Sequence, residues 1–167
     1  MTSESADAEK TKPHSGLSFR LFSESAKNLM AKPEVRKFRP GFSVVAKTVS
    51  NLLKAKHLDD KKIFASTEIK ALEKIIEESL LNLSTLKTSL DNIQRKNSAR
   101  VSYSRIKISK AECYDAVFSA HLTKRAMQAL IEYDEVSVLL YQLFSTGCIS
   151  QLERQKYRKI ASKAINT

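Results

Sequence analysis

The longest regular pattern in the chain runs from Thr67 to Arg95, where apolar residues recur at alternating steps of three and four. This spacing predicts a helix with a heptad-like seam, because residues three and four apart share one helix face. One polar residue interrupts the seam, and we assign it no function. The seam consists of Ile69, Leu72, Ile76, Ser79, Leu83, Leu86, Leu90 and Ile93.

Helical spacing also covers the chain before this seam. Ser23 is suited to cap a helix that runs from Glu24 to about Ala31, and Pro33 ends that helix. Apolar residues at helical spacing predict a second helix over residues 42–57. The basic loop between the two helices, residues 32–41, is interpreted as a solvated connector, and a loop that contacts phosphates is the alternative.

In the C-terminal half, Ser109 precedes Glu112 by three residues, which is the spacing of a capping box and predicts a helix from Ser109. Thr123 is suited to cap a further helix that ends before Gly147, although one long kinked helix fits the same pattern. Ser150 begins the last helix. The first of these helices carries Ala111, Tyr114, Val117, Phe118 and Leu122, and the last is expected to pack through Leu152, Ile160, Ala161 and Ile165.

Two short stretches alternate as strands do. In an extended chain, residues 101–108 place one set of side chains on each side. Residues 17–22 are the competing candidate for the DNA-reading strand, and Arg20 is the one basic residue among them. The first set is Val101, Tyr103, Arg105 and Lys107, and the second is Ser102, Ser104, Ile106 and Ile108.

Composition supports a mainly α fold, because 167 residues contain only three glycines and three prolines. We expect a flexible polar arm over residues 1–16 and one helical domain over 17–167. The formal net charge of +11 indicates a basic surface that attracts polyanions, nucleic acid first among them.

Catalysis is poorly supported. Cys113 and Cys148 form no CxxC or Cys/His cluster, and His14, His57 and His121 have no evident partners. The chain has no glycine-rich phosphate loop, nucleophile elbow or metal-ligand spacing. We therefore expect no enzyme activity, no cofactor, no metal and no small-molecule substrate.

The same sequence favours a cytoplasmic location. No apolar stretch reaches the roughly 18 residues of a membrane span. The first sixteen residues lack the apolar core of a secretory signal. Two separated cysteines fit a reducing compartment.

A basic strand followed by a helix favours double-stranded DNA as the partner. The major groove admits a two-stranded β-ribbon, which one strand from each subunit of a homodimer would form. Tyr103, Arg105 and Lys107 would then face base edges, while Ile106 and Ile108 cover the helical core. A charged edge strand without a DNA role is the alternative.

Phosphate contacts are expected beside this ribbon. Basic side chains there would provide affinity and register without sequence choice, and the helix that begins near Thr123 offers free amide donors. The predicted phosphate contacts are Arg95, Lys96, Arg100, Lys110, Lys124 and Arg125.

Two parts of the sequence resemble a known family. One is residues 41–55, GFSVVAKTVSNLLKA, followed by the long helix; the other comprises Tyr133-Asp134-Glu135, Leu139-Leu140 and Gly147-Cys148-Ile149. The layout over residues 17–160 is similar to proteins of conjugative plasmids and integrating conjugative elements that include the activator AcaB. The resemblance implies a ribbon-helix-helix homodimer that regulates transfer genes, with a ribbon-helix-helix core at about residues 100–145. It also implies a bacterial host, in which the protein binds promoter DNA and is associated with the nucleoid or a plasmid.

A second hypothesis comes from the seam of the long helix. A heptad-like apolar face is also typical of a helical protein-interaction module, such as an assembly factor of a conjugation or secretion system. DNA retardation in a gel and the oligomeric state distinguish the two hypotheses, because the ribbon requires a dimer.

Overall fold

The computed structural model describes residues 16–30, 42–98, 111–117 and 120–166 of the chain. Within these ranges lie two strands and five helices. In chain order they are β1 (Gly16–Leu21), α1 (Glu24–Met30), α2 (Phe42–Ala55), α3 (Lys62–Ser98), β2 (Glu112–Val117), α4 (His121–Ser145) and α5 (Gln151–Ile165).

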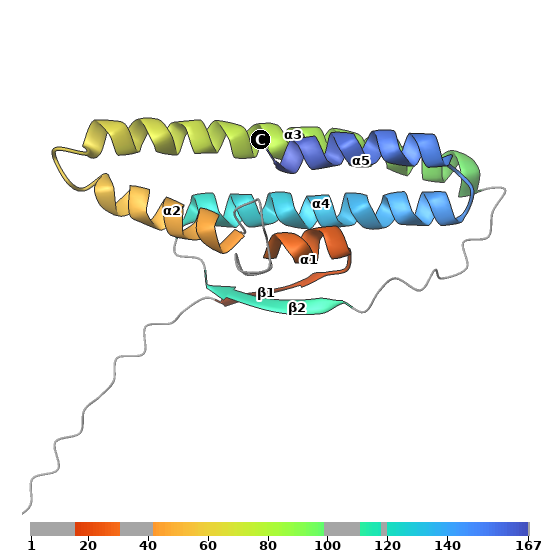
Figure 1. Ribbon diagram of the computed structural model, residues 1–167, viewed down its shortest axis with the longest axis horizontal. Coiled ribbons are helices and arrows are strands. Elements are labelled where there is room, and N and C mark those ends of the chain that lie inside the picture. Colours follow the sequence, from red (N-terminus) through yellow and green to blue (C-terminus); the bar gives the residue numbers. More distant parts are fainter. Residues whose placement is uncertain (1–15, 31–41, 99–110, 118–119, 167) are drawn as a thin grey trace, which may run out of the picture.

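Helix α3 spans the length of the molecule (Figure 1). Its 37 residues extend about 55 Å at 1.5 Å per residue. Helix α2 folds back along the first half of α3, α4 runs parallel to α3, and α5 returns antiparallel beside its second half. Helix α1 and the sheet lie on the far side of α4.

The predicted seam forms the buried face of α3, and the helix extends beyond the predicted range at both ends. Ile69 and Ile76 pack with Val49 of α2 and Leu122 of α4. The rest of the seam packs against the second half of α4 and against α5, through Leu83, Leu86 and Leu90 with Val136, Leu139, Leu140, Leu143, Ala161 and Ala164. The seam is therefore the core of this chain.

The two strands pair antiparallel in one small sheet, with Gly16 opposite Val117 and Leu21 opposite Glu112. A mainly helical fold with a small antiparallel sheet confirms the predicted fold class. Both described strands belong to the same chain. The predicted strand at residues 103–108 lies outside the described residues.

The predicted helix beginning at Ser109 is wrong over residues 112–117, which form β2. Strand β1 requires a hydrogen-bonded neighbour, and Cys113, Tyr114 and Val117 tolerate an extended backbone. Across the sheet the rings of Phe19 and Tyr114 stack with centroids 5.7 Å apart. Glu112 accordingly begins a strand and caps no helix.

Three predicted helix signals are confirmed. The Ser23 hydroxyl accepts a hydrogen bond from the Ala26 amide at 3.2 Å, which caps α1. Ser150 and Glu153 form a reciprocal capping box at the start of α5. Gly147, with φ of 72°, ends the α4 region in the left-handed conformation that favours glycine.

Two details of the C-terminal helices differ from prediction. Helix α4 begins at His121, so Thr123 lies inside it, and the capping position is Ala120, whose side chain accepts no hydrogen bond. In α5, Leu152 and Ile160 are exposed, because the helix turns Ala161 and Ala164 toward the core instead.

Candidate nucleic-acid interface

The sheet presents one face to the core and one to solvent. Leu21 is fully buried in a cluster with Met127 and Leu130 of α4, where Phe19 and Tyr114 also pack. On the other face, Arg20 and its register partner Cys113 are exposed. The competing ribbon candidate, residues 17–22, is thus a strand paired within its own chain.

The predicted base-reading residues Tyr103, Arg105 and Lys107 lie outside the described residues, as do Arg100 and Lys110. Their chain neighbours on both sides are described. Residue 98 ends α3, and residue 112 begins β2. The basic segment of residues 99–111, which contains Arg100, Arg105, Lys107 and Lys110, therefore connects the end of the longest helix to the sheet in the chain.

The remaining predicted phosphate contacts lie at two separate places. Arg95 and Lys96 are exposed in the last turn of α3. Lys124 is exposed and Arg125 half-buried near the start of α4, beside the first half of α3. Because α3 and α4 run parallel, the two pairs are roughly 30 Å apart along the bundle. The described residues do not bring them into one patch.

The start of α4 is less accessible than the sequence indicated. Its first turn is packed in the core, with Leu122 and Thr123 both buried. The amide of Lys124 donates to the Ala120 carbonyl at 3.2 Å, within the helix. Lys124 and Arg125 therefore offer a partner their side chains, whereas the main-chain donor of Lys124 is already used.

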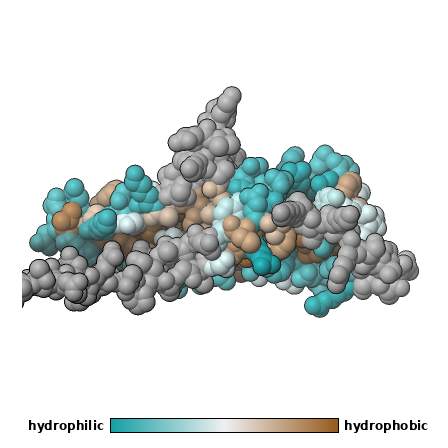
Figure 2. All heavy atoms as spheres, turned by 90° about the horizontal axis from the view of Figure 1, so that it is seen from below, coloured by the Kyte–Doolittle hydropathy of each residue, from teal (hydrophilic) through white to brown (hydrophobic). Residues whose placement is uncertain are grey.

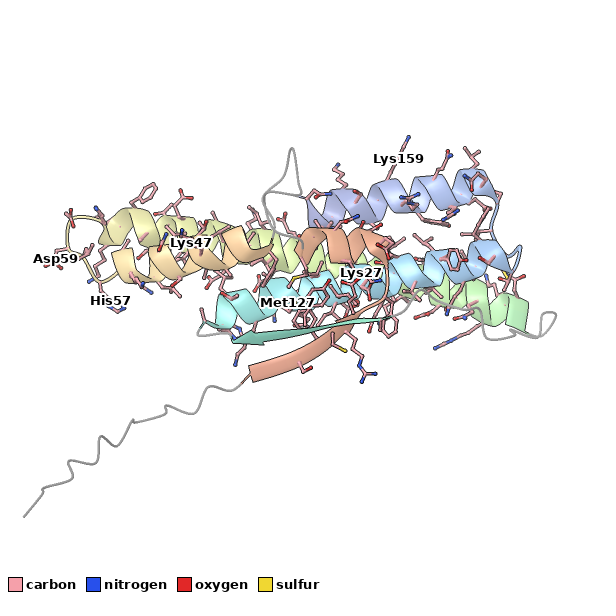
Figure 3. The ribbon with its side chains drawn as sticks, turned by 60° about the horizontal axis from the view of Figure 1, so that its bottom comes forward. Lys27, Lys47, His57, Asp59, Met127 and Lys159 are labelled. Carbon is pink, nitrogen blue, oxygen red and sulfur yellow. The ribbon has the colours of Figure 1, made fainter. Side chains whose placement is uncertain are left out.

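Helix α5 adds a basic surface. Lys156, Arg158, Lys159 and Lys163 are exposed, and Figure 3 shows Lys159 pointing away from the rest of the molecule. The acid of this helix, Glu153, is engaged in the capping box, and the hydrogen bonds from Ser150 lower the pKa of its carboxyl. Because Glu153 is the one acid of α5, basic side chains predominate on the exposed surface of this helix.

Asp134 has a structural role that the sequence alone did not predict. Its side chain is 2% exposed, and its two carboxylate oxygens accept hydrogen bonds from the amides of Phe22 at 2.9 Å and Ser23 at 2.6 Å. These amides lie between β1 and α1, so α4 fixes the point where the chain leaves the sheet. The adjacent Glu135 is exposed, as expected for neighbours on a helix. The sequence contained one signal of this role: Asp134 follows Met127 by seven residues and Leu130 by four, so it lies on the apolar face of α4, where an acid is unusual.

A second polar group links α1 to β2. The ammonium of Lys27, only 7% exposed, lies 3.0 Å from Glu24 and 3.7 Å from Glu112. The hydrogen bond to Glu24 raises the pKa of Lys27. The Tyr114 hydroxyl donates to Glu112 at 2.7 Å, and burial together with this carboxylate raises the pKa of Tyr114 to about 12.

Ion pairs also join the two long parallel helices. Lys87 of α3 lies 3.7 Å from Glu132 and donates to Glu135, both on α4. The hydrogen bond to Glu135 raises the pKa of Lys87. These contacts support the alignment of α3 and α4 that the buried seam sets.

Hydrophobic residues gather toward the middle of the face viewed from below, between more hydrophilic ends (Figure 2). Among the described helices, none has the length and hydropathy needed to cross a bilayer. Over the same residues, His, Cys, Asp and Glu side chains form no group of three or more that could hold a metal ion.

Comparison with models of known protein families and with curated proteins yields no match. Among solved structures, the chain is similar to AcaB from uropathogenic E. coli, with a TM-score of 0.57 and 14% sequence identity. The similarity covers 90% of this chain and 72% of the AcaB chain. At this level of identity the comparison establishes a shared fold: the chain has the architecture of AcaB.

Proposed function

We propose that this protein is a sequence-specific DNA-binding transcriptional regulator, an activator of conjugative transfer genes. Residues 17–167 form its DNA-binding domain, and a homodimer pairs residues 103–108 of two subunits as a ribbon in the major groove. The observation that carries the proposal is the basic segment that joins the exposed end of α3 to the sheet, within a fold similar to AcaB.

Charge density is the first support. From residue 94 to residue 111 the chain contains no acid, and the next acid is Glu112. An uninterrupted basic stretch neutralises phosphates and releases their counterions, which drives binding to DNA of any sequence. The basic residues are Arg95, Lys96, Arg100, Arg105, Lys107 and Lys110.

Sequence choice is assigned to three side chains of this segment. Arg105 has the fork geometry that grips guanine O6 and N7 with two hydrogen bonds, and Lys107 makes the same contact less rigidly. The Tyr103 hydroxyl can donate to or accept from a base edge. The flanking cations, together with Lys124 and Arg125, would contact phosphates.

The competing interaction-module hypothesis loses its main support. It rested on the heptad-like seam of α3, but Ile76, Leu83 and Leu90 of that seam are at most 9% exposed inside the chain. A seam that is buried by α2, α4 and α5 is not available to a partner helix. DNA binding is therefore the better-supported function.

The assignment is tested with the double variant Arg105→Ala/Lys107→Ala in a gel-shift titration on selected operator DNA. Loss of two base contacts at about 1–3 kcal/mol each predicts at least tenfold weaker specific binding. The matched control is Lys47→Ala/Lys54→Ala, which removes the same charge from exposed positions of α2. If the folded test variant binds as tightly as the parent, these residues do not read the operator.

Two simpler measurements address the proposal as a whole. Mixed genomic DNA should be retarded at low salt, and an absence of retardation would favour the interaction module. Light scattering should give twice the monomer mass of 18.8 kDa. A stable monomer at all concentrations would exclude the two-subunit ribbon.

A further inference from the structure

A groove of 500 Å³ lies where the start of α1, α4 and α5 meet. Its volume is in the range of sites that take small molecules, about 300–1,000 Å³. Its walls combine cations, aromatic rings and hydroxyls. They comprise Phe22, Ser23, Glu24, Ser25, Tyr133, Ser137, Val138, Leu140, Tyr141, Arg154, Arg158 and Ala161.

Two guanidinium groups line one wall, because Arg154 and Arg158 are one turn apart on α5. The guanidinium carbon of Arg154 lies 4.5 Å from the centroid of the Phe144 ring, which holds this side chain in place. Among the described residues neither arginine has a carboxylate partner within 4.0 Å. The one acid of the groove wall, Glu24, is paired with Lys27 at 3.0 Å.

The β1–α1 junction and α4 contribute aromatic and polar side chains to the groove. Phe22 and Tyr141 are 37% and 44% exposed, although large aromatic residues are usually covered. The Ser23 hydroxyl uses its oxygen to accept from Ala26, so its hydrogen is available to a ligand. A groove that contains both arginines and exposed aromatic rings suits a ligand with a negative group attached to a flat ring, because the arginines can bind the charge and the rings can pack against the ring.

We propose that this groove binds a small aromatic anion, in which a phosphate or carboxylate contacts Arg154 and Arg158 and the ring packs against Tyr141 and Phe22. A bound ligand also touches the β1–α1 junction, because Phe22 and Ser23 are the residues whose amides Asp134 holds. Binding therefore stabilises the attachment of the sheet to α4.

The test uses the full chain and needs no DNA. Adenosine monophosphate and benzoate probe the phosphate and carboxylate forms, and inorganic phosphate is the ring-free probe. Titration calorimetry should detect binding of one of the two aromatic probes, with a rise in the unfolding temperature. In Arg154→Gln/Arg158→Gln, affinity should fall at least about tenfold, as expected for loss of charge-assisted hydrogen bonds.

The matched control is Lys156→Gln/Lys159→Gln, which removes the same charge from exposed positions of α5 outside the groove. Affinity in this variant should stay within about twofold of the parent, since the direct contacts remain. A second variant, Tyr141→Ala, keeps both arginines and should weaken the aromatic probe while leaving inorganic phosphate unchanged. Circular dichroism confirms that each variant is folded.

Four results would overturn the proposal. The first is that neither aromatic probe binds at millimolar concentration. The second is that both charge variants lose affinity equally, which would indicate non-specific electrostatic attraction of the anion. The third is that Tyr141→Ala binds the aromatic probe as tightly as the parent. Displacement of the probe by an unrelated DNA duplex would assign the arginines to the DNA backbone and would also end it. All of these outcomes are independent of operator recognition.

Discussion

At the scale of single residues, the described structure depends on a few polar side chains that connect distant segments. Asp134 holds two amides more than one hundred residues earlier in the chain. Burial of a carboxylate is costly unless hydrogen bonds replace water, and both oxygens of Asp134 receive one from a main-chain amide. Its position on α4 thus fixes the path of the chain between β1 and α1.

Asp134→Asn should destabilise the protein by about 1–3 kcal/mol, because the amide group replaces one acceptor with a donor that faces a main-chain N–H. Urea unfolding measures the loss. The matched control is Glu135→Gln, whose side chain is 48% exposed and pairs with Lys87; it should change stability by less than about 1 kcal/mol. Equal losses in both variants would contradict the role of Asp134.

The Tyr114 phenol should lose its proton at a higher pH than an ordinary tyrosine. Its pKa of about 12 exceeds the ordinary value of 10.0, so the folded chain holds the phenol proton more tightly than the unfolded chain. The resulting stability is complete below pH 10 and is lost as pH rises from 10 to about 12.

Ultraviolet absorbance of tyrosinate follows this titration. Tyr114→Phe should remove the late component, and Glu112→Gln should move the pKa of Tyr114 back toward 10.0 by removing a neighbouring negative charge. A titration curve that is identical in the parent and Tyr114→Phe would show that Tyr114 is not the late group.

At the scale of elements, α3 illustrates how a helical pattern becomes a core. Its seam was assigned from spacing alone, and the structure buries that same face. Leu81 of α3 is 68% exposed, whereas Leu83 is fully buried. The two leucines differ by about 200° around the helix axis, which separates core from solvent.

Leu83→Ala should therefore cost about 2–5 kcal/mol, as expected for a buried leucine that leaves a cavity. Leu81→Ala should change stability by less than about 0.5 kcal/mol, because its side chain is already in water. Thermal and urea unfolding of the two variants in parallel measure the difference. Similar losses at the two positions would show that the orientation of α3 is wrong.

The turn between α4 and α5 offers a second test at this scale. Gly147 has φ of 72°, and a Cβ added there would meet nothing within 4 Å. Gly147→Ala should therefore lower the free energy of unfolding by about 1–2 kcal/mol, because alanine disfavours this backbone conformation and not because its side chain clashes. Gly147→Asn should lose less in urea unfolding, because asparagine tolerates this backbone region better.

At the scale of the whole molecule, two long parallel helices require a connection that returns along the bundle. Residues 99–120 connect α3 to α4 in the chain, and they contain Arg105, Lys107 and β2. The proposed DNA-reading segment therefore lies in the chain between the last residue of α3 and the first residue of β2.

The affinity for DNA should depend steeply on salt. With about six phosphates neutralised, log affinity should fall by about 0.9 per phosphate for each unit of log salt concentration. Fluorescence anisotropy across a salt series measures the slope. If α5 supports binding, Lys156→Gln/Lys159→Gln should reduce the slope by about two while leaving sequence preference unchanged. A flat salt response would contradict DNA as the partner.

The sequence by itself determined the helical class, the face of α3 that is buried, the strand near residue 17 and the caps at Ser23, Gly147 and Ser150. These features are local: they depend on the spacing of apolar residues and on side chains that reach their own backbone. Helix propensity and capping act within one or two turns, so a single sequence contains the information.

Only the tertiary structure decided that residues 112–117 form a strand, that Asp134 is a buried anchor, and that Leu152 and Ile160 face water. In each case a partner far along the chain supplies the deciding contact: β1 completes the hydrogen bonds of β2, the β1–α1 junction uses the carboxylate of Asp134, and α3 and α4 select which face of α5 is buried. Such pairings are set by packing between elements, and local spacing does not encode them.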